Sequence, residues 1–590
     1  IMRIFEANIS LQVCTFLKDF LFKTESFEKA NRKMFDAFGI NTFFDNNDDF
    51  QNLKESVSSI AFSSVGEPDR AEYGDFQTNE DLAFKVAKQL SDNFVSPEIV
   101  IEPTCGKGNF IISSLSCFKS IKKLFGIEIY RPYVWEAKFN IVDFYLSNPN
   151  INKPEITIIH SSVFDFNFKK ISKQFPQTNL LIIGNPPWVT NSKLGSLNSS
   201  NLPVKANFKK QNGLDAMTGK GNFDIAEYIT LMLFDAFQFH NGYLALLLKN
   251  SVIKNIVFDQ KDKQYRIGKI EKYCIDSKKE FNVSVEASLL FCQLNMNPSI
   301  ECTEFDFYDK SKKLSFGWLN SKFVSNVEDY NETKNIDGVC PYEWRQGIKH
   351  DCSNVMELER INGHFINKLS EEITLEEDLI YGFLKSSDLK NTVIKNTKKQ
   401  VIVTQTKVGQ ETSYIQHLYP ATYNYLKANI SSFQARKSSI YNGKPLFSIF
   451  GIGDYSFKPF KVAISGLYKT YHFTLVLPQN DKPVMLDDTC YFIGFDKIEF
   501  AVYAIILLNY SKTEEFLKSI TFSDAKRVFT KDILMRLDLL SISKTITQKE
   551  IEEQIIYLND KYSLSVSLSQ WDSFINEMTP LKEKQLTIFG

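Results

Sequence analysis

The stretch from Leu180 to Trp188, with the sequence LLIIGNPPW, restricts the fold of this chain more than any other. Its four apolar residues and glycine predict a short strand that is buried on both faces, as in a parallel sheet. Two consecutive prolines then fix φ twice and remove two backbone N–H donors, so the strand must end there. The carbonyl groups beside the prolines are therefore expected to face a cleft instead of a neighbouring strand.

This strand end gathers hydrogen-bond acceptors and an aromatic face. Asn185 has a side-chain oxygen, Pro186 has a backbone carbonyl, and Trp188 has a large ring. Together they suit a planar group that carries an NH2, because the acceptors can hold the amino hydrogens while the ring stacks. We therefore expect Asn185, Pro186, Pro187 and Trp188 to be catalytic. The alternative, for a motif of this kind on its own, is a strand-ending turn with a packed tryptophan.

The composition limits which other sites are expected. At 590 residues and 68.0 kDa, the chain is long enough for two or three domains. Its formal net charge is −1, so DNA binding would require the 69 Lys and Arg residues to be segregated onto one face. The nine Cys residues include no C-x-x-C pair, which indicates neither a metal site nor disulfides and favours reduced, intracellular thiols. No apolar run has transmembrane length, and no signal-peptide layout is present.

A glycine loop precedes the Asn-Pro-Pro motif. A predicted strand at 99–101 runs into EPTCGKGNF (102–110) and then into an apolar helix. Gly106 and Gly108 allow backbone amides to approach a ligand, and the start of the helix adds a partial positive charge. The next predicted strand ends at Glu128, whose carboxylate can accept both ribose hydroxyls of an adenosine cofactor. The alternative for Glu128 is an acid exposed to solvent at a strand end.

Strands and helices alternate along this part of the chain. Further strands are expected at 156–165, 242–249 and 283–294, with a helix at 224–239. Residues 1–70 begin with apolar side chains at helical spacing and predict a short helical segment. The repeated β-α order predicts an α/β fold with a doubly wound, Rossmann-like sheet, and a site at the carboxyl ends of its strands.

The motifs EPTCGKGNF, GIEI and GNPPW, in this order, resemble those of the S-adenosylmethionine-dependent adenine-N6 DNA methyltransferases. The order is similar to the gamma arrangement of that family, in which the target-recognition domain comes last. Two later stretches, WRQGIKHD (344–351) and FSIFGIGDY (447–455), resemble recognition domains of type II modification enzymes. The resemblance implies a helical N-terminal segment (1–70), a methyltransferase domain (71–297), a connecting segment (298–343) and a mixed α+β recognition domain (344–590).

The resemblance also implies roles for individual residues, and it implies no metal. The cofactor-binding residues would be Phe76, Thr78, Glu102, Thr104, Gly106, Gly108 and Glu128. Either Ser162 or Asp165 would contact the adenine of the cofactor. Trp188 and Phe281 would stack on a target base that is flipped out of the helix.

The activity implied is transfer of a methyl group from S-adenosylmethionine to N6 of an adenine in a specific duplex sequence, in the cytoplasm of a prokaryote. The alternatives are the methyltransferase half of a combined restriction-modification enzyme, methylation of a protein glutamine or of RNA, and a DNA-binding subunit without catalysis.

The expected partners are double-stranded DNA and a separate restriction endonuclease. Candidate phosphate contacts are Lys395, Lys398, Lys399, Arg436, Lys437, Lys458 and Lys461, and candidate base contacts are Gln434 and Asn442, with solvated surface groups as the alternative. The terminal Gln585–Phe589 (QLTIF) resembles peptides that bind the replication sliding clamp, unless it packs against its own chain.

Overall fold

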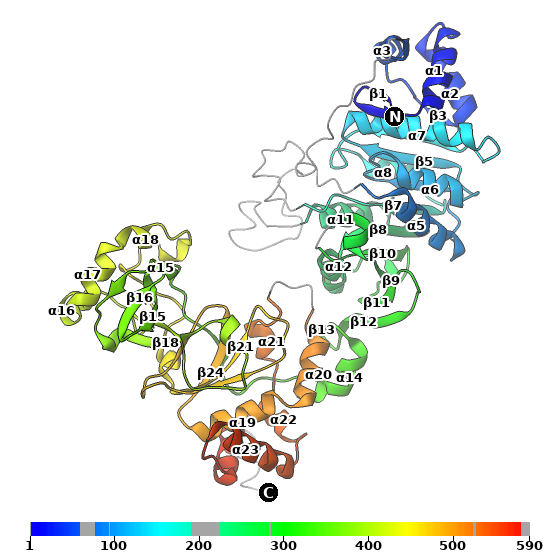
Figure 1. Ribbon diagram of the computed structural model, residues 1–590. Coiled ribbons are helices and arrows are strands. Elements are labelled where there is room, and N and C mark those ends of the chain that lie inside the picture. The colour runs from blue at the N-terminus through cyan, green and yellow to red at the C-terminus, as the bar shows by residue number, and fades with distance from the viewer. Residues whose placement is uncertain are drawn as a thin grey trace. The chain divides into compact units, whose positions relative to one another are not determined.

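The computed structural model describes residues 2–58, 77–93, 95–189, 224–282, 285–522 and 527–579. The chain divides into two compact units, 1–323 and 324–590, which are described separately here (Figure 1).

Unit 1 is built on an eleven-stranded sheet with the order β13-β12-β11-β9-β10-β8-β7-β4-β5-β6-β3. The strands are β3 (Ile40–Asn41), β4 (Ile99–Glu102), β5 (Lys123–Glu128), β6 (Glu155–His160), β7 (Leu180–Gly184), β8 (Gly242–Lys249), β9 (Ile267–Cys274), β10 (Ala287–Leu294), β11 (Glu301–Asp306), β12 (Lys312–Leu319) and β13 (Lys322–Val324). Those from β3 to β8 are parallel, and β10 runs antiparallel to β8 and β9. The predicted α/β, Rossmann-like class is confirmed.

The centre of this sheet is buried on both faces, as the apolar runs predicted. Every residue of β4 and β7 is buried. The two strands are neighbours, and the chain order reverses between them, with β5 and β6 on one side and β8 on the other. Such a reversal opens a crevice at the carboxyl ends of the strands.

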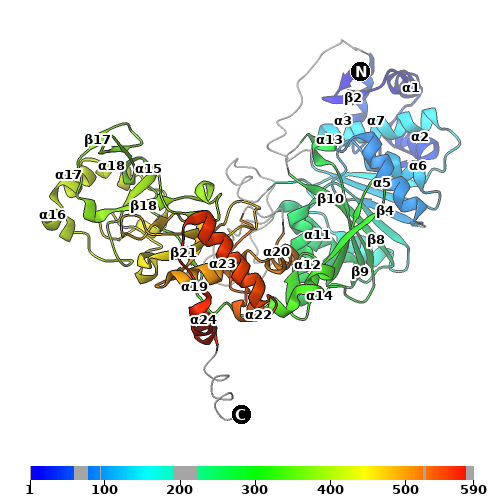
Figure 2. The same cartoon turned by 60° about the horizontal axis from the view of Figure 1, so that its bottom comes forward.

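Helices cover both faces of the sheet (Figure 2). One layer contains α5 (Glu80–Asp92), α6 (Asn109–Cys117) and α7 (Arg131–Ser147), and the other contains α8 (Phe168–Gln174), α11 (Ile225–Phe237) and α12 (Asn250–Lys263). The short α13 (Ser277–Phe281) precedes β10. Strand β6 ends at His160 and β10 begins at Ala287, so both are shorter than the sequence predicted.

The N-terminal segment contains helices, as predicted, but also strands. They are a hairpin of β1 (Met2–Ile4) and β2 (Ala7–Ile9), the helices α1 (Leu11–Phe22), α2 (Phe27–Phe38) and α3 (Asn47–Ser58), and the edge strand β3. The buried Lys138 of α7 fixes the segment to the sheet, because its Nζ donates to the carbonyl oxygens of Phe43 (2.9 Å) and Thr42 (3.2 Å).

The segment expected as a connection, 298–343, contains sheet structure. Strand β11 pairs with β9 in parallel and with β12 in antiparallel. Trp318 at the end of β12 donates through Nε1 to the carbonyl of Phe258 in α12, at 2.9 Å. These contacts attach 301–323 to unit 1, so the boundary between the units falls at Phe323, inside the expected connection.

Unit 2 has the mixed α+β character that was predicted. A five-stranded sheet has the order β14 (Arg345–Gln346), β24 (Cys490–Phe495), β21 (Phe460–Ser465), β22 (Thr474–Val476) and β19 (Val393–Ile394). A six-stranded sheet has the order β17 (Glu372–Ile373), β16 (His364–Asn367), β15 (Glu357–Ile361), β20 (Lys399–Ile402), β18 (Ile380–Leu384) and β23 (Met485–Leu486).

The helices of unit 2 pack around the buried α19 (Ile498–Leu508) or cover the six-stranded sheet. They are α14 (Val327–Thr333), α15 (Ser353–Met356), α16 (Tyr414–Leu418), α17 (Pro420–Ala428), α18 (Ile430–Gln434), α20 (Ser511–Ile520), α21 (Lys531–Leu534), α22 (Leu539–Ser543), α23 (Gln548–Tyr562) and α24 (Trp571–Met578). Short 3-10 turns are η1 (Lys334–Ile336), η2 (Glu377–Leu379), η3 (Ser386–Asp388), η4 (Ser439–Tyr441), η5 (Asp454–Phe457) and η6 (Leu568–Gln570). None of the helices in the described ranges has the length and apolar character needed to cross a membrane.

The central position of β7 leads to a test of the fold. Ile182 is fully buried and pairs with Ile101 of β4. The substitution Ile182→Ala should lower the free energy of unfolding by about 2–5 kcal/mol, because it leaves a cavity between tightly packed layers. Leu11→Ala is the control, because Leu11 is 68% exposed and should change stability by less than about 0.5 kcal/mol. Urea unfolding followed by circular dichroism measures both, and equal effects would contradict the central position of β7.

Candidate active site

Three strand ends define the site. Glu102 ends β4, Glu128 ends β5, and Asn185 follows β7. Because β4 pairs in parallel with both β5 and β7, the three residues lie at the same edge of the sheet. This is the edge at which the strand order reverses, where a doubly wound sheet is expected to bind its ligand.

Asn185 is fixed by residues from two other parts of the chain. Its side-chain Nδ2 donates to Oγ1 of Thr78 at 3.1 Å, and its backbone carbonyl accepts from Oγ1 of Thr104 at 3.4 Å. Thr78 is itself buried, and its carbonyl accepts from Nδ2 of Asn109 at 2.7 Å. The structure therefore brings the loop before α5, the glycine loop and the Asn-Pro-Pro motif together. Since Nδ2 is committed to Thr78, Oδ1 is the acceptor that Asn185 can offer.

The glycine loop has a backbone that needs glycine. Gly106 and Gly108 have φ of 51° and 85°, in the left-handed region. A Cβ on Gly106 would lie 2.7 Å from Oε1 of Gln77, so the Gln77 side chain would have to shift for alanine, in addition to the strain of the positive φ. Gly108 directly precedes α6, so the loop opens onto the start of that helix.

Glu128 holds this loop in place. Its carboxylate accepts from the backbone N–H of Gly106 at 2.8 Å and from that of Tyr130 at 2.7 Å. Hydrogen bonds to a charged acceptor are stronger than neutral ones. They fix the loop between β4 and α6 relative to the end of β5.

Glu102 is a buried acid. It is 3% exposed, and its Oε2 has no hydrogen-bond partner among the described residues. Burial raises the pKa of Glu102 well above its usual value, and the charge of Glu128 raises it further. Gly184 lies against this side chain, since a Cβ there would be 3.4 Å from Cγ of Glu102. A buried acceptor of this kind suits a cationic or hydrogen-bond-donating ligand.

The two aromatic residues expected to stack on a base contact each other in the structure. The rings of Trp188 and Phe281 have centroids 4.9 Å apart and meet edge to face, at 66°. Trp188 is 5% exposed and donates through Nε1 to the carbonyl of Leu247 at 3.2 Å. Phe281 is half-buried at the end of α13, so it is the ring with room to move. Their role in stacking stays a prediction.

The remaining expected cofactor residues differ in their surroundings. Ser162 accepts through Oγ from the backbone N–H of Phe164 at 3.3 Å, just after Ser161, whose N–H donates to the carbonyl of Glu128 at 2.9 Å. Asp165 is exposed in the following turn. Ser162 is therefore the one that adjoins the end of β5. Phe76 lies outside the described residues, as does the peptide Gln585–Phe589.

A chain of polar contacts around the glycine loop was not predicted. Lys107 Nζ lies 3.3 Å from Oε1 of Glu136 in α7, and its carbonyl accepts from Nδ2 of Asn140 at 2.9 Å. Glu136 is buried and also accepts from the backbone N–H and from Nδ2 of Asn8, both at 3.1 Å. The N-terminal hairpin thus supports the loop through α7. No local motif marks Asn8 or Glu136 for this role.

Two basic residues expected to contact phosphate are committed elsewhere. Lys461 is 1% exposed and donates to the carbonyl of Lys458 at 2.8 Å, and burial lowers its pKa to about 7. Arg436 lies over the ring of Tyr441 and donates to the carbonyl of Ser448 at 2.7 Å. For Lys461 the prediction of a phosphate contact is therefore wrong. The residue type alone does not show whether a lysine or arginine is buried against a sheet or exposed to solvent.

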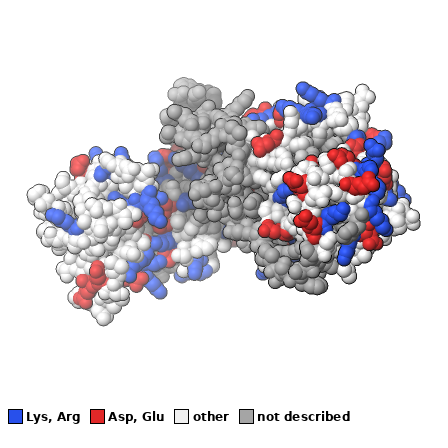
Figure 3. All heavy atoms as spheres, turned by 90° about the horizontal axis from the view of Figure 1, so that it is seen from above, with Lys and Arg blue, Asp and Glu red and all other residues white. Residues whose placement is uncertain are grey.

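Charged side chains are distributed differently on the two units. On the faces seen in Figure 3, blue and red side chains are interspersed on unit 1, whereas blue ones gather along one flank of unit 2. The stretch 385–469 contains 13 Lys or Arg residues and three Asp or Glu residues. The near-zero total charge therefore conceals a strongly basic part of unit 2.

The Rossmann-like sheet, the glycine loop and the Asn-Pro-Pro-Trp turn define a methyltransferase, and the comparisons agree. The Type II methyltransferase M.NspV from a Nostoc species is 40% identical over 482 residues, which are 81% of this chain and 99% of that protein. The chain therefore belongs to the type II methyltransferases of restriction-modification systems, and the resemblance stated from its motifs is confirmed at that level. No protein-family model matches the chain.

A solved structure extends the likeness to the fold of most of the chain. The Type IIL restriction-modification enzyme MmeI, in complex with DNA, has a TM-score of 0.51 and 13% sequence identity. The match covers 90% of this chain and 80% of that chain. At this identity the likeness concerns the fold alone.

The contact between the N-terminal hairpin and the glycine loop can be tested without a ligand. Asn8→Ala removes a side-chain donor to Glu136 and should loosen the Lys107 contact. Amide hydrogen exchange in a peptide covering 103–112 should then become about fivefold faster, as expected for the loss of one hydrogen bond. Asn52→Ala, at an exposed position of α3, is the matched control. Unchanged exchange in the Asn8 variant would show that the Asn8 side chain does not support the loop.

Proposed function

We propose that this protein transfers a methyl group from S-adenosylmethionine to N6 of an adenine that is flipped out of duplex DNA at a specific sequence. The observation that carries the proposal is the fixed position of Asn185. Its amide nitrogen is bonded to Thr78, and its acceptor oxygen and the Pro186 carbonyl lie at the end of β7. This pair of acceptors matches the two hydrogens of an exocyclic amino group.

The residues at the strand ends fit S-adenosylmethionine. Glu102 offers a buried acceptor without a hydrogen-bond partner among the described residues, which suits the ammonium group of the methionine part. Glu128 lies at the end of β5, where it can accept from ribose hydroxyls. Thr78, Thr104, Gly106 and Gly108 would line the cofactor site between them, and Ser162 or Asp165 would contact the adenine. When bound, the cofactor supplies a methyl group that is activated by the positive charge on its sulfur.

The protein contributes position and electrostatics. Hydrogen bonds from the target amino group to Asn185 Oδ1 and to the Pro186 carbonyl withdraw the nitrogen lone pair from conjugation with the ring, and orient it. Pro187 keeps the turn rigid, because its φ is fixed. Flipping the nucleotide costs a few kcal/mol, and stacking on Phe281 and Trp188 would offset about 1–3 kcal/mol of this. Since the two rings meet edge to face, Phe281 would have to move to admit a base.

DNA is the substrate proposed for unit 2 as well. The basic stretch 385–469 supplies the charge that attracts a polyanion independently of its sequence. Lys395, Lys398, Lys399, Lys437 and Lys458 remain candidates for phosphate contacts, and Gln434 and Asn442 for base contacts. A separate restriction endonuclease is the expected functional partner of a type II methyltransferase.

The decisive experiment is transfer of labelled methyl groups to DNA, followed by single-molecule sequencing to identify the modified base. We expect N6-methyladenine at one recurring sequence. Asn185→Ala should reduce methyl transfer at least about a hundredfold while S-adenosylmethionine still binds, because the acceptor acts mainly on the reacting nitrogen. Asn93→Ala, at the exposed end of α5, should behave like the wild type. Methylation of cytosine, or equal loss of cofactor binding and turnover in the Asn185 variant, would contradict the proposal.

The raised pKa of Glu102 predicts a proton release when the cofactor binds. The carboxyl group holds a proton to a higher pH in the free protein, because burial disfavours its charged form. The ammonium group of a bound S-adenosylmethionine would favour the charged form of Glu102 and lower the pKa of this carboxyl again. Cofactor affinity should therefore rise with pH below the raised pKa, with protons released.

Isothermal titration calorimetry in buffers of different ionisation enthalpy measures this release. Glu102→Gln should bind more weakly and should lose the release that comes from this group. Proton uptake by the wild type, or an unchanged release in the variant, would remove Glu102 from the cofactor site.

A further inference from the structure

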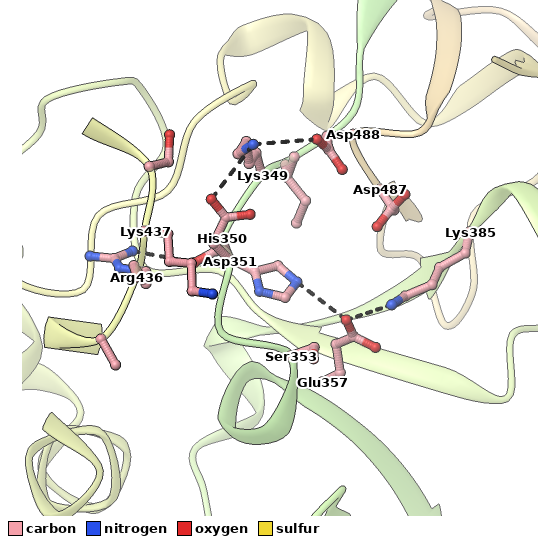
Figure 4. A pocket seen from close by; sticks show the side chains of 13 residues that line it. Lys349, His350, Asp351, Ser353, Glu357, Lys385, Arg436, Lys437, Asp487 and Asp488 are labelled. Atoms are coloured by element: carbon pink, nitrogen blue, oxygen red, sulfur yellow. Dashed lines mark hydrogen bonds and ion pairs between the residues drawn. The ribbon is translucent and has the colours of Figure 1, made fainter. Parts of the chain in front are cut away.

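Unit 2 contains a pocket of about 750 Å³ that is lined by none of the residues of the proposed methyl-transfer site (Figure 4). Five segments form it: the loop 348–353 after β14, Glu357 at the start of β15, Lys385 directly after β18, residues 435–438 after α18, and Asp487–Asp488 after β23. The pocket therefore joins loops from both sheets of the unit.

The two stretches that resemble recognition domains meet at this pocket. Lys349 pairs with Phe450 through two backbone hydrogen bonds, of 2.8 and 2.9 Å. A Cβ on Gly451, which has φ of 68°, would lie 2.3 Å from the carbonyl oxygen of Gly347. This close approach and the pairing of Ile348 with Asp487 fix the backbone of the pocket wall. Fixed backbones of this kind are what a specificity site requires.

The floor of the pocket is a buried network in which two lysines pair with one carboxylate. Glu357 is 3% exposed, and its carboxylate lies 2.6 Å from Lys385 Nζ and 2.8 Å from Lys368 Nζ. Burial opposes the charge of Glu357, but the lysine hydrogen bonds outweigh it and lower its pKa. Burial lowers the pKa of His350 to about 4, so this ring is neutral at pH 7 and accepts through Nδ1 from the backbone N–H of Cys352. The floor is therefore held together by ion pairs, although Oε2 of Glu357 is buried and has no hydrogen bond of good geometry among the described residues.

The rim differs from the floor. Lys349 Nζ lies 3.6 Å from Asp351 and 3.9 Å from Asp488, and all three side chains are partly exposed. Both distances are longer than a hydrogen bond. The ammonium group and the two carboxylates therefore attract one another electrostatically without a hydrogen bond between them. Figure 4 shows the ammonium group of Lys349 between the carboxylates of Asp351 and Asp488. A donor flanked by acceptors is thus presented to solvent.

This mixture of charges favours a base edge over a phosphate. A phosphate at the rim would meet two carboxylates beside one ammonium group. The major-groove edge of a G·C pair has the complementary pattern, because guanine O6 and N7 accept while cytosine N4 donates. Within the base pair, guanine O6 and cytosine N4 are joined by a hydrogen bond and lie about 3 Å apart. This separation is similar to the distances between Lys349 Nζ and the two carboxylates at the rim. Lys pairs with guanine, and Asp accepts from cytosine N4.

We propose that Lys349, with Asp488 and Asp351, reads a G·C pair of the DNA target through its major-groove edge. The proposal rests on the proposed function in that the ligand is duplex DNA, and it names the residues that determine part of the sequence specificity. Lys437, which is exposed beside the pocket and makes no ion pair with any described residue, would contact the backbone and position the base pair.

The test is a binding selection with the full-length protein on duplexes that contain a randomised stretch, without cofactor. The wild type should enrich one motif with at least one G·C position. Lys349→Met and Asp488→Asn should each lose discrimination at the same G·C position, by roughly ten- to hundredfold, and keep the rest of the motif. Asp351→Asn, which preserves the shape of a residue with φ of 49°, provides a second carboxylate variant. Thermal unfolding of each variant checks that the unit is folded.

Two further lysine variants distinguish sequence-specific base recognition from sequence-independent attraction to the DNA backbone. Lys437→Met should weaken binding to all sequences alike and lower the salt dependence by about one charge, without changing the motif. Lys549→Met, at an exposed position of α23, should change neither. If folded Lys349, Asp488 and Asp351 variants keep the wild-type motif, or if the wild type enriches no sequence, the pocket does not read DNA. If the motif is enriched and altered as expected but never methylated, the pocket proposal stands and the proposed methyl transfer fails.

Discussion

The structure of unit 1 depends on how a strand that is buried on both faces comes to an end. Strand β7 lies between β4 and β8 and cannot continue past Gly184, because Pro186 and Pro187 have no N–H to donate to a neighbour. The same break turns Asn185 toward Thr78 and away from the sheet ladder. A feature that would weaken an ordinary strand thus ends β7 where the strand order reverses, which is the place where doubly wound sheets bind their ligands.

The strand ends carry charge that the fold alone does not balance. Glu128 is stabilised by backbone N–H groups and at the same time fixes the glycine loop. Glu102, one strand away, has a buried oxygen without such support among the described residues. A buried acid of this kind is destabilising unless it holds a proton or a ligand offsets the penalty, and the proposed cofactor site would supply such a ligand. Glu102 and Glu128 both lie at a strand end, but their surroundings differ. Glu128 fixes the glycine loop, whereas Glu102 is proposed to bind the cofactor.

The sequence predicted the parts of the fold that depend on local pattern. The apolar runs of β4 and β7 predicted strands in the middle of a sheet. The glycine spacing predicted the loop between β4 and α6. Long-range features were beyond its reach. The edge strand β3 has two residues and forms only because β6 offers it a partner. The support of Lys107 by Glu136 and Asn8 joins residues that are far apart in the chain.

Charge was the least readable property of the sequence. Lys461 and Lys349 are the same residue type in different surroundings. Lys461 is buried in a sheet of unit 2, whereas Lys349 lies at the rim of a pocket between two carboxylates. The total charge of −1 likewise hid the basic stretch from 385 to 469. Attraction and discrimination then require different arrangements. Attraction needs an excess of cations, because every phosphate is alike, whereas discrimination needs donors and acceptors in a fixed order, because base pairs differ only in that order. A pocket lined by as many carboxylates as cationic side chains contributes little to attraction, and the proposed role in discrimination is consistent with that balance.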